Sequence, residues 1–340
     1  MLQVMKLYIA DSHPDYPQIE LITLRTGKYQ TPIKKEFFKI GRRLENSDLV
    51  LVPHDAIHFF SDNDYLEYLN GLAKRKIVLY SDRGDFPKKP KISNSIALRV
   101  ALNPGENRNN KMVIPYNVES LDFLPFREYH ASPDISFVGY IPQVSIGRIL
   151  RTAINTPLHP IVGNGAIVRK LAIKDLRKSG LSQKIIPRDF YGVVNGEQDD
   201  LTEYRKEYLN VVSTSDYILS PRGDANQSAR FYETLSAGRI PIMPDSKICL
   251  PTLVTRNAES MCYFQSFTKI YPLTKSQELR NLLMNDWLSL SNSNFYRKRQ
   301  VEIRTFFEKN LNFNTYLSSL FRIEIDNFIN LAKHGNTAFV

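Results

Sequence analysis

The sequence predicts an α/β protein built from two facing domains, and three observations support that class. The chain has 340 residues, about twice the usual length of a single domain. In the first half, short apolar runs rich in β-branched residues alternate with polar or helical stretches, a pattern typical of a parallel sheet covered by helices. The same pattern restarts after Ile141, and this restart predicts a second α/β domain.

Six segments are expected to form the strands of the first half. They share an apolar run bounded by polar or helical residues. The predicted strands are Val4 to Ile9, Leu49 to Val52, Ile77 to Tyr80, Ile96 to Leu102, Met112 to Ile114 and Ile135 to Val138. Two helices are expected between them, one beginning at Thr31-Pro32 and one at Ser61, because a hydroxyl side chain caps a helix well. We assign these elements to a first domain, residues 1–143.

The second domain is expected to span residues 144–312. Its predicted strands are Lys184 to Ile186, Tyr217 to Leu219 and Ile240 to Met243. From Ser276 onward the sequence has the character of helices. The last of these is predicted from about Thr315 to Lys333, and we expect residues 313–340 to pack back as a helix toward the first domain.

Composition indicates the cellular compartment and the class of partner. The two cysteines, Cys249 and Cys262, cannot form a disulfide framework, which favours a reducing compartment. The chain reaches Asp11 too soon for the core of a signal peptide, and no apolar run approaches the roughly 18 residues of a membrane span. We therefore expect a cytoplasmic protein whose net charge of +10 attracts polyanions and permits peripheral membrane contact through a basic surface.

The most informative segment runs from Asp216 to Asp245 and is predicted to form strand, loop, helix and strand. Pro221 and Gly223 end the first strand, a helix begins at about Gln227, and Gly238 suits the position after a helix end. In doubly wound domains, ligands bind beyond the carboxyl ends of strands, where a helix N-terminus offers free N–H groups to phosphate. The segment therefore predicts a phosphate-binding loop.

Four polar side chains in this segment match the chemistry of a nucleoside diphosphate. Arg222 lies in the loop and Ser228 in the first helical turn, so both can reach phosphate oxygens. Arg230 and Glu233 are three residues apart and share one helix face. A carboxylate at that depth can accept hydrogen bonds from two ribose hydroxyls. The alternative is that Arg230 and Glu233 form a surface ion pair and that the loop is only a turn.

The order of motifs in this segment resembles the signature of the exostosin family of glycosyltransferases. The matching residues are Pro221-Arg222-Gly223, Ser228-Ala229-Arg230-Phe231-Tyr232-Glu233, Leu235-Ser236-Ala237-Gly238 and Ile240-Pro241. The resemblance is close over residues 204 to 251 and implies a GT-B fold of two Rossmann-like domains facing a cleft. It implies that the second domain holds a nucleotide-sugar donor without an essential metal, through Arg222, Gly223, Ser228 and Arg230 at the diphosphate and Glu233 at the ribose.

By the same resemblance, the expected activity is inverting transfer of a sugar from a UDP-sugar to a glycan or lipid-linked acceptor in surface polysaccharide synthesis. No cofactor is expected besides the donor substrate. The rival hypothesis is a non-catalytic, basic protein that binds nucleic acid or glycan. It explains the charge but leaves the motif around Arg230 and Glu233 unexplained, and the sequence has no aromatic and basic interleaving of the RNA-binding type.

An inverting transfer needs a general base near the acceptor hydroxyl, and strand-end loops of the first domain are the expected source. We rank His54 and Asp55 first, because they directly follow a strand that should be buried, and we expect Arg230 to assist departure of the leaving group. Other strand ends offer Asp11, His13, His58, Asp82, Arg83 and Asp85.

Two patterns in the sequence imitate metal sites. His54 and His58 have the i,i+4 spacing of a zinc-protease motif, but the intervening glutamate and a distal ligand are missing. Asp62 and Asp64 have the Asp-x-Asp spacing of some metal-dependent glycosyltransferases, although a helix cap explains them better. We therefore expect no metal ligands.

Overall fold

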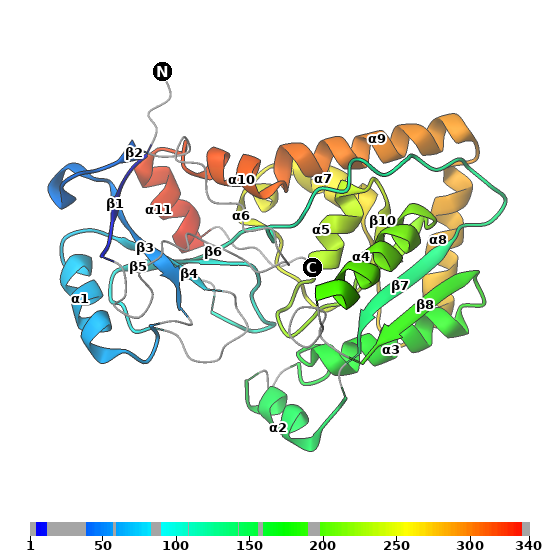
Figure 1. The fold of residues 1–340 in the computed structure, drawn as a ribbon, viewed down its shortest axis with the longest axis horizontal. Helices are drawn as coiled ribbons and strands as arrows, with labels where there is room; N and C mark the ends of the chain where they lie inside the picture. The colour runs from blue at the N-terminus through cyan, green and yellow to red at the C-terminus, as the bar shows by residue number, and fades with distance from the viewer. Residues whose placement is uncertain are drawn as a thin grey trace.

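The computed structural model describes residues 5–11, 39–56, 59–82, 90–107, 109–141, 143–155, 159–189 and 198–334. These residues form two parallel sheets with helices packed around them (Figure 1). The helix expected at Thr31-Pro32 and the candidate residues His13, His58, Arg83 and Asp85 lie outside the described residues. For His54 and Asp55 the structure describes the strand but not the side chains.

The first sheet has six strands, all parallel. Their spatial order is β2 (Lys39–Ile40), β1 (Lys6–Ile9), β3 (Leu49–Asp55), β4 (Val78–Asp82), β5 (Ser95–Arg99) and β6 (Lys111–Val113). Helix α1 (Asn63–Ala73) begins after Asp62, whose carboxylate accepts a hydrogen bond from the Tyr65 N–H at 2.9 Å. The helix expected to begin at Ser61 is present, but its cap is Asp62 rather than Ser61.

The second sheet has five parallel strands. Their order is β11 (Lys269–Tyr271), β10 (Ile240–Pro244), β9 (Tyr217–Leu219), β7 (Ile135–Tyr140) and β8 (Gln183–Arg188). Strand β7 is therefore in the second sheet, and assigning Ile135 to Val138 to the first half was wrong. Ile135 and Phe137 pack in the core of the second domain with Ile173 and Leu176, so the sheet changes between β6 and β7, before the boundary expected at 143.

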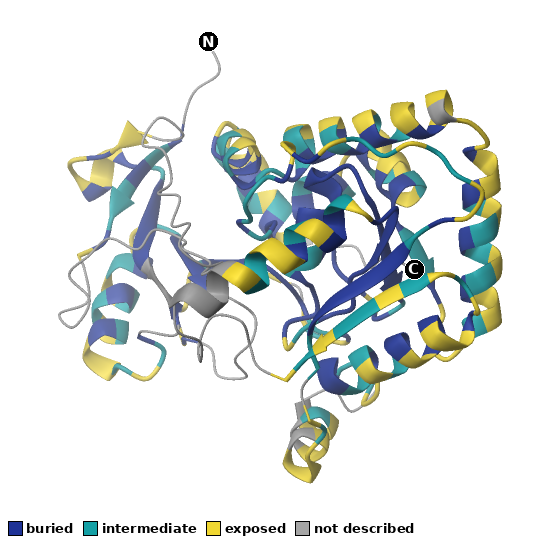
Figure 2. Ribbon diagram, turned by 45° about the vertical axis from the view of Figure 1, so that its right-hand side comes forward, coloured by how far each residue is buried: buried dark blue, intermediate teal, exposed yellow. Residues whose placement is uncertain are grey.

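Helices complete the second domain. They are α2 (Ile146–Asn155), α3 (Gly165–Lys178), α4 (Gln198–Ser213), α5 (Ala229–Ser236), α6 (Thr252–Thr255), α7 (Ala258–Phe267), α8 (Ser276–Ser289) and α9 (Ser293–Asn310). Figure 2 shows the central strands of this sheet buried between helices whose outer faces are exposed, whereas the edge strand β8 is only partly buried. Strands β8 and β9 flank β7 on opposite sides, so the chain reverses its winding direction at β7 and β9.

The C-terminal segment forms two helices, α10 (Phe313–Leu320) and α11 (Ile325–His334). The single long helix predicted from Thr315 to Lys333 was therefore wrong. The chain turns after Leu320, where the carbonyl of Phe321 accepts a hydrogen bond from the Met5 N–H at 3.1 Å. Apolar side chains of both helices, including Leu317 and Phe328, join the core of the first sheet. Figure 1 shows α11 beside the blue strands and α10 between α11 and α9.

The carboxyl ends of the two sheets face each other. The loop after β5 meets the loop after β9, where Arg222 Nη2 donates to Asn103 Oδ1 at 3.0 Å and Asn226 Nδ2 donates to the Leu102 carbonyl at 3.2 Å. Two parallel-sheet α/β domains facing in this way are the GT-B arrangement, so the predicted fold class is confirmed. In the described part of the chain, no helix has the length and apolar character needed to cross a bilayer.

Candidate functional site

The reversal of winding between β7 and β9 creates a crevice at their carboxyl ends, the usual place for ligands in open α/β sheets. The loop of residues 220–228 follows β9, and helix α3 begins beside it at Gly165. A Cβ atom on Gly165 would overlap the carbonyl oxygen of Gly223. Arg169 of α3 donates to the Arg222 carbonyl at 2.9 Å and to the Tyr140 carbonyl at 2.5 Å. These contacts therefore fix the start of α3 against the loop that follows β9.

Sequence reasoning missed the α3 side of this crevice. Asn164 caps α3 by accepting hydrogen bonds from the N–H groups of Ala166 and Ile167 at 3.1 and 3.2 Å. The signal was present as Gly163-Asn164-Gly165 before an apolar-periodic helix, which combines a capping residue with a glycine at a close approach. The sequence alone does not show what Gly165 approaches, because its contact, Gly223, lies in a loop about sixty residues further along the chain.

Helix α5 presents its N-terminus to the same crevice. Ser228 is the N-cap residue, and the helix begins at Ala229, two residues later than expected. The Ser228 hydroxyl makes no cap hydrogen bond to the helix, although the residue is only 6% exposed. The first N–H groups of a helix lack intrahelical partners and carry the positive end of the dipole. This end of α5 is therefore suited to an anion.

Arg222 lies within the loop rather than on its surface. Its guanidinium donates to the Val162 carbonyl at 2.9 Å and to the Asp224 carbonyl at 2.8 Å, besides the bond to Asn103 across the domains. Arg222 is only 1% exposed. To bind phosphate directly, Arg222 would have to give up some of these hydrogen bonds. In this structure it connects the loops that contain Asn103, Val162 and Asp224.

Arg230 and Glu233 form an alternating chain of charges with Arg205 and Glu119, and the ring of Tyr208 lies beside it; we call these five residues the carboxyl-edge network. Glu233 accepts from Arg230 Nη1 at 3.2 Å and from Arg205 Nη1 at 2.8 Å. Arg205 also donates to Glu119 at 2.7 Å. The Arg230 guanidinium lies over the Tyr208 ring, 3.8 Å from its centroid. The ion pair of the alternative interpretation exists, but as part of a larger and partly buried network.

Burial and charge act against each other in the carboxyl-edge network. Burial would raise the pKa of Glu233, but Arg230 and Arg205 outweigh it and hold that pKa below the ordinary value. Burial would lower the pKa of Arg230, yet Tyr208 and Glu233 raise it. The side chains of both arginines keep 30% exposure, against 9% for Glu233. Arg205 and Arg230 therefore share Glu233 as a partner, and both guanidinium groups stay partly exposed to solvent.

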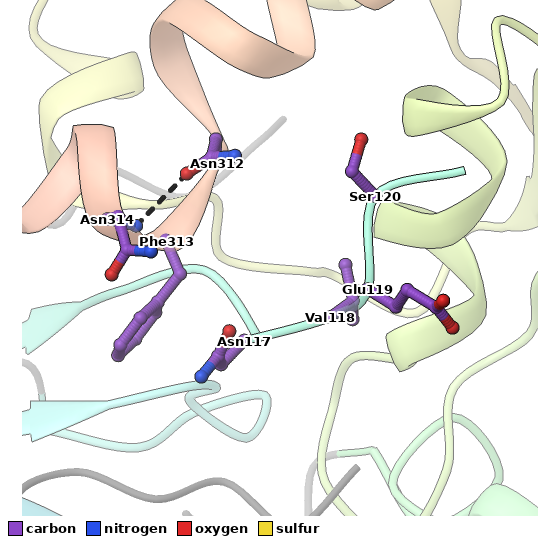
Figure 3. Close-up of a pocket in the computed structure, with 7 residues that line it drawn as sticks. All are labelled: Asn117, Val118, Glu119, Ser120, Asn312, Phe313 and Asn314. Atoms are coloured by element: carbon purple, nitrogen blue, oxygen red, sulfur yellow. Dashed lines mark hydrogen bonds between the residues drawn. The ribbon is translucent and has the colours of Figure 1, made fainter. Parts of the chain in front are cut away.

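Arg205, Tyr208 and Glu119 are further members that the sequence analysis did not single out. Arg205 and Tyr208 are three residues apart on α4, which is the spacing of one helix face. Glu119 comes from the segment that links the two sheets and also lines a polar cavity of about 200 Å³. In Figure 3 this segment faces the start of α10, and the cavity is lined by Asn117, Val118, Glu119, Ser120, Asn312, Phe313 and Asn314.

The candidate bases lie at the carboxyl edge of the first sheet. Strand β3 runs two residues further than Pro53, so His54 and Asp55 end the strand, with Asp55 in register with Ser81 after an irregularity. Asp82 is buried and forms an ion pair with Arg99 at 3.1 Å, which gives it a structural partner.

Asp11, by contrast, is exposed. Its main chain is held by two hydroxyls of α1, since the Asp11 N–H donates to Tyr68 Oη at 3.0 Å and the Asp11 carbonyl accepts from Tyr65 Oη at 2.7 Å. Burial raises the pKa of Tyr68 to about 12, so that hydroxyl stays neutral at physiological pH. Asp11 thus has a fixed main chain and an exposed side chain at the same edge as the two residues ranked first.

One cluster has the composition of a metal site, and it lies at the opposite, amino edge of the second sheet. His130, Asp134 and Asp216 offer ligand atoms within 4.8 Å of one another. Arg127 occupies the cluster, donating to both carboxylates at 2.6 Å. Tyr296 Oη also donates to Asp216 at 2.7 Å. A guanidinium already pairs with both carboxylates, so the cluster fits an ion-pair network better than a cation site.

Comparisons with known proteins return distant structural likenesses. No family model and no curated protein matches the sequence. Solved structures that resemble the chain include a lipopolysaccharide outer core galactosyltransferase, WaaB, in its apo form (12% identity, covering 96% of this chain and 99% of that chain, TM-score 0.42). A glycosyltransferase from Rickettsia africae ESF-5 covers 84% of this chain and 71% of that chain at 13% identity and a TM-score of 0.35.

The catalytic domain of starch synthase IV from Arabidopsis thaliana, bound to ADP and acarbose, covers 84% of this chain and 73% of that chain at 9% identity and a TM-score of 0.38. With TM-scores of 0.42 or lower, these likenesses carry no argument about activity. The fold assignment rests on the two parallel sheets and on the way their carboxyl ends face each other.

Proposed function

We propose that this protein is an inverting glycosyltransferase of the exostosin-like kind. It moves a sugar from a nucleotide-diphosphate sugar, a UDP-sugar by the resemblance of its motif, to a glycan or lipid-linked acceptor in surface polysaccharide synthesis. The observation that carries the proposal is the coincidence of the Arg230 and Glu233 motif with the α5 N-terminus at the crevice between β7 and β9. Phosphate, ribose and a leaving group each find a matching partner there.

In this proposal the donor lies across the start of α5. The helix N–H groups and the Ser228 hydroxyl bind the diphosphate, and Gly223 lets the loop backbone approach it closely. Arg222 holds the loop in shape. Glu233 accepts the ribose hydroxyls by exchanging one of its arginine partners, which leaves Arg230 directed to the β-phosphate.

The reaction is a single displacement at the anomeric carbon. The acceptor oxygen forms a bond to that carbon as the bond to the β-phosphate oxygen breaks, and the nucleoside diphosphate leaves with the bonding electrons. A base at the carboxyl edge of the first sheet, His54 or Asp55 in our assignment, takes the acceptor proton. Arg230 and the α5 dipole stabilise negative charge as it grows on the leaving group, which is the work of a metal ion in metal-dependent enzymes.

Nucleotide binding is the first test of this proposal. In a thermal-shift and calorimetric titration, UDP or a UDP-sugar at a hundred times its dissociation constant should stabilise the fold by about 2.7 kcal/mol. Arg230→Ala and Glu233→Ala should reduce the shift, whereas Arg322→Ala, an exposed arginine outside the second domain, should leave it unchanged. Absence of a shift with every nucleoside diphosphate, together with steeply salt-dependent nucleic-acid or heparin binding, would favour the rival binding protein.

The metal and base assignments are tested by measuring the rate of sugar transfer. We expect transfer to survive EDTA, since cations of the chain replace the ion; complete loss of transfer that manganese restores would contradict metal independence and redirect attention to Asp64. His54→Ala or Asp55→Asn should lower kcat while leaving UDP binding intact. If Asp11→Asn alone has that effect, the base assignment moves to Asp11.

A further inference from the structure

Helix α2 exposes a row of large apolar side chains. Ile146 and Ile154 are 77% and 78% exposed, and Leu150 between them is 58% exposed. Ile149 is also exposed, which completes an i, i+3, i+4, i+8 pattern on one helix face. In the described part of the chain, no other helix exposes more than two large apolar side chains. Isolated exposed apolar residues are ordinary, but a contiguous helical stripe marks an interaction surface.

The orientation of α2 is the reverse of that expected for a surface helix. Thr152, on the face opposite Leu150 by helical spacing, is half-buried and accepts a hydrogen bond from Asn164 Nδ2 at 3.2 Å. A helix of a globular protein normally turns its apolar stripe toward the core. Here a polar residue contacts the body of the protein and the apolar side chains are exposed, so the stripe does not pack against the described part of the chain.

The place of α2 in the fold connects it to the crevice. The helix follows the carboxyl end of β7 and precedes Asn164, the cap of α3. Figure 1 shows it projecting from the body of the second domain, and Figure 2 shows it largely exposed. A surface that contacts α2 would therefore lie on the same side of the molecule as the loops at the crevice.

Charge identifies the kind of surface. The sequence of α2 contains Arg148 and Arg151 and no acidic residue, and the chain carries a net charge of +10. An apolar stripe with arginines on the same short helix is the composition of a helix that lies in the interface of an anionic bilayer. A soluble acidic partner would complement the positive charge of this helix but would leave four aliphatic side chains exposed.

We propose that α2 docks the protein on a lipid bilayer containing anionic headgroups, with Ile146, Ile149, Leu150 and Ile154 inserted among the acyl chains. The contact is peripheral and reversible, because ten residues supply only one apolar stripe. The docking stands independently of the proposed transferase activity, since it rests on exposure and charge. If the transferase proposal also holds, the docked orientation brings lipid-linked acceptors to the crevice.

The first experiment measures binding of the full chain to vesicles by flotation. We expect binding to phosphatidylcholine vesicles that contain about a third phosphatidylglycerol, and weaker binding to phosphatidylcholine alone. A triple variant, Ile146→Gln, Leu150→Gln and Ile154→Gln, should lower the partition coefficient at least about tenfold. The matched control replaces exposed apolar residues elsewhere, Phe123→Gln, Leu288→Gln and Val301→Gln, and should bind like the wild type.

A second measurement reports insertion. The native Trp287 is fully buried, so a tryptophan introduced by Leu150→Trp gives a signal that can be assigned. Its emission should shift to the blue on anionic vesicles and should be quenched by brominated acyl chains. The proposal is overturned if the wild type ignores anionic vesicles, if the triple variant binds as well as the control, or if the introduced tryptophan stays unquenched. Concentration-dependent dimers that the triple variant abolishes, without vesicle binding, would instead assign the stripe to a second copy of the chain.

Discussion

The two edges of the second sheet carry charge clusters of similar composition and opposite character. At the amino edge, Arg127 bridges Asp134 and Asp216, and Asp216 is fully buried with a further bond from Tyr296. At the carboxyl edge, Arg205 and Arg230 share Glu233, and each arginine keeps 30% exposure. In the first cluster the cation is covered, since Arg127 is only 15% exposed, and the exposed member is the carboxylate Asp134; the second cluster presents cations to solvent.

This difference separates a structural network from a candidate site. In the amino-edge cluster, Arg127 is paired with both carboxylates, so a ligand that binds Arg127 or Asp216 would have to break buried bonds. In the carboxyl-edge network, the two arginines are partly exposed. A ligand with negative charge and hydroxyl groups could therefore bind them without breaking a fully buried ion pair. Composition alone does not distinguish the two clusters. By residue types, the amino-edge cluster resembles a metal site, although Arg127 already occupies it.

The largest effect should come from breaking the amino-edge cluster. Asp216→Asn leaves Arg127 without one of its charged partners and should lower the free energy of unfolding by about 3 kcal/mol. Urea denaturation measures this loss. As a control, Glu203→Gln removes an exposed pair with Lys206 and should cost less than about 1 kcal/mol. A loss of UDP affinity by folded Asp216→Asn would break the comparison, because it would make the amino edge part of the site.

The carboxyl-edge network should instead affect turnover. Arg230→Ala should lower kcat by roughly 10²-fold, because a guanidinium aimed at the leaving phosphate is worth more in the transition state than in the ground state. Glu233→Ala should mainly raise KM, since ribose contacts are the same in both states. Steady-state kinetics with the donor separate the two effects. Wild-type kcat and KM in both variants would reduce the network to an ordinary ion pair.

Glycine contacts at the crevice should give an intermediate effect on stability. Gly165→Ala places a methyl group against the Gly223 carbonyl and should destabilise the fold by about 1–3 kcal/mol while displacing loop 220–228. Gly71→Ala, in α1 with open space around its Cβ, should stabilise by about 0.5–1 kcal/mol. Thermal denaturation compares the two. Equal effects of the two substitutions would mean that the contact between α3 and the loop is loose.

The smallest effect concerns acid. The pKa of Glu233 lies below its ordinary value of 4.5 in the folded protein, because Arg230 and Arg205 outweigh burial. Its charge therefore stabilises the fold above the unfolded pKa, and that contribution is lost as pH falls through the folded pKa. The difference in unfolding free energy between wild type and Glu233→Gln should be constant near neutral pH and should shrink below about pH 4.5. A difference that grows in acid would contradict the assigned direction.

Much of the fold could be predicted because local patterns decide it. Apolar β-branched runs predicted strands near Leu49, Ile77, Tyr217 and Ile240, and a capping residue predicted a helix beginning near Ser61, although Asp62 is the cap. The strand–loop–helix unit around Ser228 and Arg230 also depends on residues close together in sequence. In each case the interactions that select the structure lie within a turn or two of the residue concerned.

Only the tertiary structure decided which sheet β7 joins, where the C-terminal helix breaks, and which partners complete the candidate site. The sheet of β7 depends on packing against α3, and the break after Leu320 on a hydrogen bond to Met5 at the other end of the chain. Likewise, Arg205 and Glu119 meet Glu233 from distant segments. By itself the sequence determined the types of most elements and the motif around Arg230 and Glu233, because these are local. Contacts between distant segments arise only when the chain folds, and they decided what is buried, paired or left open.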